Sequence, residues 1–226
     1  MIALALDTAT SDLIAGIVDT TSGRTLAEAV KRTRAHNEEL IPTVGALLDD
    51  TGLSYPDIGV IVVGCGPGPF TGLRVGMATA SALGQALGVP MHGVVTHDAA
   101  AALLDATGTA LVVTDARRRE VYWALYRDGA RVQGPEVCAP AALPVGGPVD
   151  VLSVPAELAE VVAVPAGRVV YRAPGAAGLV AAADLTAQPG PLVPHYLRRP
   201  DAVPPAAKPK SPAIPDVDMA ELGGRQ

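Results

Sequence analysis

Glycine and proline crowd residues 64–76, between an apolar run and a pattern typical of a helix. A strand, a glycine-rich turn and a helix in this order place free backbone N–H groups at a helix N-terminus, where phosphate can bind. Gly66, Gly68 and Thr71 are the candidate phosphate contacts. The segment lacks the Gly-Lys-Ser/Thr ending of a P-loop, and its prolines remove N–H donors. A tight turn that requires positive φ is therefore the competing interpretation.

Two acidic turns are a second candidate for phosphate chemistry. Asp7 and Asp115 each end an apolar strand pattern, and Asp12 and Glu120 each precede the next strand pattern. Two such turns facing one another would form a cleft for ATP or ADP, with Asp7, Thr8 and Asp115 as phosphate contacts. Each turn could also be an Asx or Ser/Thr turn that closes a hairpin, so the residues alone assign no cofactor.

No arrangement of residue types indicates a metal site or a catalytic centre. The histidines show no pair at the i, i+3 or i, i+4 spacing of a helical metal site. There is no Gly-x-Ser-x-Gly motif, and neither cysteine lies beside a basic cluster. The arginines at 117–119 are typical of a solvated hairpin turn, which could also touch phosphate or RNA. We therefore predict no catalytic residue and no metal ligand. The residues considered are His36, His92, His97, His195, Cys65 and Cys138.

The elements that would position these residues follow from the hydrophobic pattern. It predicts the order β-β-β-α-β-α-β, followed by one more helix. Asn37 is the expected N-cap of the first helix, and Gly52 and Gly88 are the expected ends of the first two helices. We expect strands at residues 2–6, 13–18, 25–31, 58–63 and 91–95, and helices at 37–50, 73–87 and 97–104.

The opening pattern recurs over residues 110–126, which indicates one structural unit used twice. We therefore expect an α/β protein with a first subdomain at residues 1–107 and a smaller second one at 108–200. An alanine-rich helix is expected at residues 176–185. Residues 201–226 are rich in proline and have too little apolar surface to fold alone, so we expect a disordered tail.

The helix at 73–87 also suggests a contact with another chain. Small residues recur every four positions along it and form a ridge almost without side chains, which would let another backbone approach closely. The first helix carries an apolar stripe. We expect the two helices to form a partner interface, through Leu40, Val44, Leu47, Leu73, Gly76, Met77, Ala80 and Gly84.

Composition limits the class of protein. Hydrophobic residues make up 49% of the 226 positions and aromatic residues only 3%, which favours α/β layers of small aliphatic side chains. A net charge of -6 argues against a free-standing nucleic-acid-binding protein. Two distant cysteines, no basic start and no apolar run of about 18 residues favour a cytoplasmic protein without a membrane segment.

Five blocks of this sequence, in order, resemble the bacterial TsaB (YeaZ) family. The most specific is Gly-Pro-Gly-Pro-Phe-Thr-Gly-Leu-Arg at residues 66–74; the others lie at 5–10, 36–48, 115–122 and 196–198. The resemblance implies the duplicated actin-like/sugar-kinase (ASKHA, ribonuclease H-like) fold with a reduced second half. It also implies a role in forming threonylcarbamoyladenosine beside the anticodon of tRNAs that read codons starting with A.

The resemblance further implies a non-catalytic subunit that pairs with its paralogue TsaD and recruits the ATPase TsaE, meeting tRNA only within that complex. A homodimer through the same helices is also open. TsaD carries a His-x-x-x-His metal pair, which residues 91–101 lack because His92 and His97 are five positions apart. The alternative is a stand-alone ATP-dependent kinase or transferase of the ASKHA superfamily.

Overall fold

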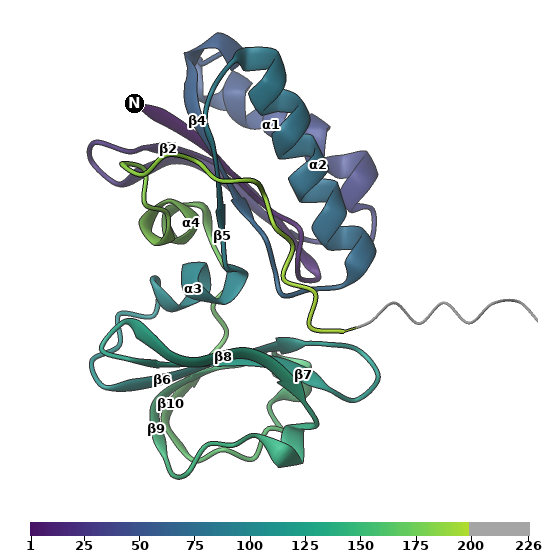
Figure 1. Ribbon diagram of the computed structural model, residues 1–226, viewed down its shortest axis with the longest axis vertical. Helices are drawn as coiled ribbons and strands as arrows, with labels where there is room; N and C mark the ends of the chain where they lie inside the picture. Colours follow the sequence, from purple (N-terminus) through teal and green to yellow (C-terminus); the bar gives the residue numbers. More distant parts are fainter. Residues whose placement is uncertain (199–226) are drawn as a thin grey trace, which may run out of the picture.

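A computed structural model describes residues 1–198 as two five-stranded mixed sheets with helices around the first (Figure 1). The first sheet has the order β3-β2-β1-β4-β5. β1 is antiparallel to β2 and parallel to β4, and β2 is antiparallel to β3. The strands are β1 (Ile2–Asp7), β2 (Asp12–Asp19), β3 (Arg24–Arg32), β4 (Ile58–Gly64) and β5 (Met91–Val94).

The second sheet repeats this topology. Its order, β10-β9-β6-β7-β8, again places an antiparallel meander beside two strands that continue the sheet in parallel. The duplicated α/β architecture expected from the sequence is therefore confirmed, and it is the actin-like arrangement. The strands are β6 (Thr109–Asp115), β7 (Val121–Arg127), β8 (Ala130–Cys138), β9 (Val149–Ser153) and β10 (Ala166–Val170).

Two long helices cover one face of the first sheet, and two short helices lie on the side toward the second sheet (Figure 1). The long pair is α1 (His36–Thr51) and α2 (Phe70–Leu87); the short pair is α3 (Thr96–Ala101) and α4 (Ala176–Ala182). Three single-turn 3₁₀ helices lie at Tyr55–Asp57, Pro140–Ala142 and Ala156–Leu158. None of the helices described within residues 1–198 is long and apolar enough to span a membrane.

The helix boundaries differ from expectation at their N-termini. The N-cap of α1 is Ala35, and Asn37 lies inside the helix, so its predicted capping role is wrong. The upstream Thr33 hydroxyl instead accepts a hydrogen bond from the Ala35 N–H and donates to Glu39 in the first turn. α2 begins at Phe70 because Pro69 supplies the cap and its carbonyl accepts from the Leu73 N–H at 3.0 Å. Gly52 and Gly88 end their helices in the left-handed conformation, as predicted.

β1 shows how one short strand supports both helical layers. Side chains alternate across a sheet, so Leu4 and Leu6 enter the core beneath α1 and α2 while Ala3 and Ala5 face α4. The alanine side is shallow, and α4 comes very close to it. A Cβ on Gly16 of β2 would lie 2.4 Å from the Cβ of Ala176, so this approach requires glycine.

The C-terminal part of the second half packs on the first sheet. Ala176 and Leu179 of α4 are fully buried against that sheet, and Leu192 contacts the core beneath α1 and α2. The second sheet is complete at Val170, and the chain then crosses back. The subdomain expected at residues 108–200 thus includes a segment that packs on the first sheet, and the tail expected at 201–226 lies outside the described residues.

Replacing Leu179 with alanine tests this return crossing. The side chain is fully buried between α4 and the first sheet, so Leu179→Ala should lower the free energy of unfolding by about 2–5 kcal/mol. Val169→Ala on β10 is the control, because Val169 is 56% exposed and should change stability by less than about 0.5 kcal/mol. Equal effects of the two substitutions in urea denaturation would contradict the packing described for α4.

Candidate functional site

The turns that follow β1 and β6 meet at a groove between the two sheets. Thr10 and Ser11 of the first turn line the same cavity as Asp115 and Arg117 of the second. Pro69, directly before α2, completes this meeting point. The structure therefore brings together the two acidic turns and the glycine-rich segment that the sequence singled out.

Asp7 does not line this groove, because its carboxylate is fully buried behind it. It accepts hydrogen bonds from the Ala9 N–H at 2.7 Å and the Thr96 hydroxyl at 2.8 Å. A Cβ on Gly64 would lie 1.8 Å from its Oδ2 atom, so glycine at the end of β4 makes room for it. Burial raises the pKa of Asp7 to about 6, although both hydrogen bonds act to lower it. This carboxylate joins β1, β4 and α3.

Thr8 fastens the first turn to α2. Its hydroxyl donates to the Gly72 carbonyl at 2.7 Å and accepts from the Gly76 N–H at 2.9 Å. The helix can approach this closely only through glycine, since a Cβ on Gly76 would lie 2.5 Å from the Thr8 hydroxyl. Thr8 therefore binds backbone groups of its own chain.

The predicted phosphate contacts of the glycine-rich loop are similarly occupied. The Gly66 N–H donates to the Thr96 hydroxyl at 3.1 Å. Gly68 packs against the first turn, because a Cβ there would lie 2.1 Å from the Ala9 carbonyl oxygen. Thr71 is exposed on the first turn of α2. Of these three, only Thr71 is presented to solvent, and the loop acts as a close-packed joint between β4 and α2.

The second acidic turn has an unusual backbone. Arg117, Arg118 and Arg119 have φ angles of +63°, +55° and +62°, a left-handed conformation that non-glycine residues seldom adopt in succession. The Asp115 carboxylate accepts from the Arg117 N–H at 2.7 Å and lies 3.7 Å from the Arg117 guanidinium. All three arginines are exposed, and Arg117 and Arg118 line cavities of the groove. The turn therefore presents cationic side chains at the groove.

A segment at residues 191–198 returns across both halves. The His195 N–H donates to the Cys65 carbonyl at 2.8 Å. The ring of Tyr196 stacks on Phe70 at 5.1 Å between centroids, and its hydroxyl accepts from Arg74 Nε at 2.7 Å. Arg198 donates to the Ala116 carbonyl at 2.9 Å and pairs with Glu120. From the sequence, Tyr196 and Arg198 were known only as part of a block that resembles the family. Their contacts with Phe70 and Glu120 were not predicted.

The eight residues predicted to contact a partner lie inside the protein. The apolar stripes of α1 and α2 pack on the first sheet, and the glycine ridge faces Thr8 at one end and Met91 near the other. A pattern of apolar and small residues marks a close contact but does not say with which chain. Within the described chain each of the following is buried, so their part in a partner interface stays a prediction: Leu40, Val44, Leu47, Leu73, Gly76, Met77, Ala80 and Gly84.

The opposite side of α2 is the exposed one. Ala78, Ala82 and Ala86 repeat every four residues on it, and no charged residue occurs from 75 to 87. On the adjacent α1, Ile41 is 45% exposed and Ala46 is also exposed. An uncharged face of α2 is therefore exposed on the outer surface, together with apolar positions of the adjacent α1.

The remaining reactive side chains are held in unreactive settings. Burial lowers the pKa of His97 to about 3, and its Nε2 lies 3.1 Å from the Thr114 hydroxyl. Burial, with a smaller effect of the nearby Asp7 charge, raises the pKa of the Cys65 thiol to about 12. Within residues 1–198 no group of three or more His, Cys, Asp or Glu side chains is placed to hold a metal ion.

Comparisons with known proteins identify the relatives of this arrangement. The family model described as "TsaD: tRNA N6-adenosine threonylcarbamoyltransferase" matches residues 28–165, more than half of the chain. The chain is 35% identical over 127 residues to the Escherichia coli protein named tRNA threonylcarbamoyladenosine biosynthesis protein TsaB, covering 55% of this chain and 54% of that protein. The chain belongs to the TsaB (YeaZ) family.

Two mycobacterial relatives extend the match to most of the chain. An uncharacterized protein of Mycobacterium tuberculosis is 52% identical over 202 residues, covering 89% of this chain and 93% of that protein. One of Mycobacterium leprae is 52% identical over 207 residues, covering 90% of this chain. The chain spans 56% of the length of the Mycobacterium leprae protein and 54% of the length of the E. coli TsaB protein.

A crystal structure shows the same fold. An uncharacterized Pseudomonas aeruginosa protein with similarity to peptidase YEAZ superposes with a TM-score of 0.70 at 24% identity, covering 87% of this chain and 99% of that one. The likeness establishes the shared TsaB-type fold.

The buried Asp7 carboxylate predicts a specific dependence of stability on pH. Its pKa is about 6 in the folded chain and 3.8 ordinarily, so between these values the unfolded chain releases the proton first. Raising the pH through this window should lower the free energy of unfolding by up to about 3 kcal/mol. Asp7→Asn keeps an acceptor for Ala9 but does not titrate, so its profile should be flatter by that amount.

Urea denaturation at a series of pH values measures this difference. Asp50→Asn, on the exposed end of α1, is the matched control and should keep the wild-type pH profile. An unchanged profile in Asp7→Asn would show that Asp7 is not the titrating group.

Proposed function

We propose that this chain is a non-catalytic subunit of the machinery that forms threonylcarbamoyladenosine in tRNAs that read codons starting with A. In this proposal it pairs with a TsaD-type transferase and recruits the ATPase TsaE. The E. coli, Bacillus subtilis and Haemophilus influenzae relatives are all named as TsaB biosynthesis proteins for this nucleoside, and the matching family model describes the transferase itself. These names support the pathway, and the structure supports the manner of assembly.

The observation that carries the proposal is the outer face of α2. An amphipathic surface helix normally presents charged side chains to water. Here Ala78, Ala82 and Ala86 occupy that face with no charged residue from 75 to 87. Small side chains in a row let a second helix approach closely, and an uncharged face loses little hydration when it is covered.

The adjacent α1 supplies the apolar centre and polar rim that protein interfaces commonly have. Ile41 is nearly half exposed beside Pro42 and Ala46. Asp49 and Asp50 are exposed toward the C-terminal end of α1, and Arg74 is exposed near the start of α2. Charged groups thus flank an uncharged centre. The same face could pair with a second copy of this chain, and we propose TsaD as the occupant because the family model names that enzyme.

A stand-alone ATP-dependent kinase or transferase is the alternative function. It would need Asp7, Asp115 and the turn at residues 66–72 to reach a nucleotide, and of these Asp115 does line the groove. Asp7 is fully buried, the Thr8 hydroxyl is bonded to α2, and Gly68 packs on the Ala9 carbonyl. The geometry therefore favours the partner role. Nucleotide turnover by the purified chain, lost in Asp7→Asn, would favour the alternative.

Ala82→Arg tests the proposed interface. Ala82 is exposed, so the substitution should leave the chain folded. In the complex, however, the partner would cover the new guanidinium group and leave its charge buried. We expect affinity for TsaD to fall at least about tenfold, with a matching loss of tRNA modification in the reconstituted system. Co-elution on size-exclusion chromatography and a modification assay are the measurements.

Ala141→Arg is the matched control, because it adds the same side chain at an exposed alanine of the second half. It should leave both co-elution and modification unchanged. Retained co-elution of Ala82→Arg with TsaD would contradict the proposed interface.

A further inference from the structure

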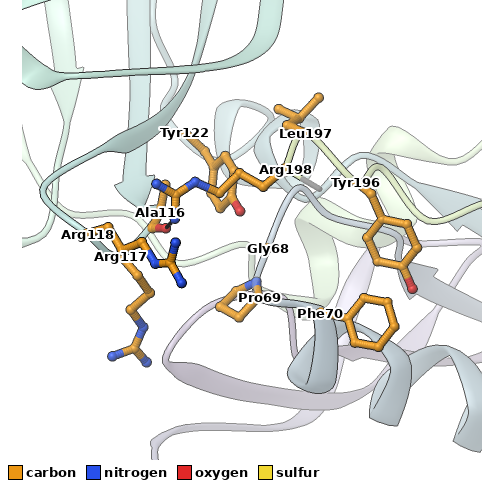
Figure 2. Close-up of a pocket in the computed structure, with 10 residues that line it drawn as sticks. All are labelled: Gly68, Pro69, Phe70, Ala116, Arg117, Arg118, Tyr122, Tyr196, Leu197 and Arg198. Carbon is orange, nitrogen blue, oxygen red and sulfur yellow. Dashed lines mark hydrogen bonds between the residues drawn. The ribbon is translucent and has the colours of Figure 1, made fainter. Parts of the chain in front are cut away.

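The groove between the two halves consists of neighbouring cavities that share lining residues. Three cavities of about 370, 20 and 700 Å³ follow one another along it, and Pro69 and Arg117 line all three. Residues 196–198 line the first cavity (Figure 2), and residues of the loop between β3 and α1 line the largest of the three. An extended ligand could therefore contact both halves at once.

The groove is cationic although the chain is acidic. Five arginines and a single carboxylate, Asp115, are among the described residues that line the three cavities. Glu157 and Glu120 pair with two of these arginines, and Asp115 lies beside a third. Among the described residues, arginines outnumber carboxylates here even after these pairs are counted, so the local charge favours an anion although the whole chain has a net charge of -6. The five are Arg32, Arg34, Arg117, Arg118 and Arg198.

Tyr122 provides a polar group aimed into the first cavity. Its side chain is only 4% exposed, and its hydroxyl points into the space beside Pro69 (Figure 2). Within residues 1–198 this hydroxyl has no hydrogen-bond partner, and it is open to the cavity, where a ligand could reach it. The surrounding wall is mostly apolar, with Pro69, Leu197 and the Tyr122 ring. The cavity therefore combines a flat apolar wall with one unused hydrogen-bonding group.

We infer that this groove binds a short single-stranded segment of RNA. One unstacked nucleotide would place its base against the apolar wall and bond to the Tyr122 hydroxyl, and Arg34 and Arg117 would pair with successive phosphates. Guanidinium groups suit phosphate because they donate paired hydrogen bonds. The inference rests on the proposed function for its choice of tRNA as the natural source of the segment.

RNA fits the groove better than a free nucleotide or an acidic peptide. A mononucleotide would occupy only the first cavity and would leave Arg34, beyond the meeting point of the turns, unused. An acidic peptide would pair with the arginines but has no reason to place a flat ring beside Tyr122. A repeating phosphate with attached bases uses both features.

Two variants of the full chain test the inference. Tyr122→Phe removes only the hydroxyl and should weaken binding of a short labelled single-stranded RNA several-fold without lowering stability. Arg34→Ala/Arg117→Ala should weaken binding at least about tenfold at low salt and reduce the slope of log affinity against log salt by about 1.4. Fluorescence anisotropy over a salt series is the measurement, with AMP and polyglutamate as competitors.

Arg24→Ala/Arg127→Ala is the matched control. It removes one arginine from each half at the opposite strand ends and should leave RNA affinity within about twofold. Equal weakening by this control, displacement by polyglutamate as effective as by RNA, or AMP binding as tight as RNA binding would each overturn the inference.

The result can be separated from the test of the partner role. If the wild-type chain fails to bind RNA while it still co-elutes with TsaD, the RNA inference fails and the partner role stands. If the chain binds RNA through Tyr122 and Arg117 but does not co-elute with TsaD, the partner role fails and the RNA groove stands.

Discussion

The two hydrogen bonds of the Thr8 hydroxyl hold the first half of this molecule together. They join the turn after β1 to the backbone of α2 at Gly72 and Gly76, where no side chain separates the two. Asp7 makes the neighbouring connection to α3 through Thr96, and Gly64 leaves space for it. Because these contacts are buried and fully paired, the turn is fixed in place and cannot also serve as a mobile phosphate loop.

This attachment decides which face of α2 meets the solvent. The glycine ridge is used against Thr8 and Met91, so the alanine ridge at 78, 82 and 86 points outward beside Ile41 of α1. Residues 191–198 then connect the start of α2 to the second sheet through Tyr196 and Arg198. The outer face of α2 is left uncharged, while the cationic turn at 117–119 faces the groove. The two proposals therefore concern different surfaces of one rigid framework.

Much of the fold followed from the sequence. Short apolar runs, Gly52, Gly88 and the paired acidic turns at Asp7 and Asp115 predicted the strands, the helix ends and the duplication, because each reflects local geometry. The site was harder. Periodicity identified Gly76 and Ala80 as contact positions but could not distinguish an internal contact from an external one. The Tyr196–Phe70 stack and the return of α4 depend on residues more than a hundred positions apart, for which no local pattern exists.

Site-specific photocrosslinking measures most directly whether the alanine ridge of α2 is the partner surface. A photoreactive side chain at Ala78 would project from the first position of that ridge, and one at Ala141 would project from the second half. We expect a crosslink to TsaD from position 78 and none from position 141 in the mixed proteins. A crosslink from 141 with none from 78 would contradict it.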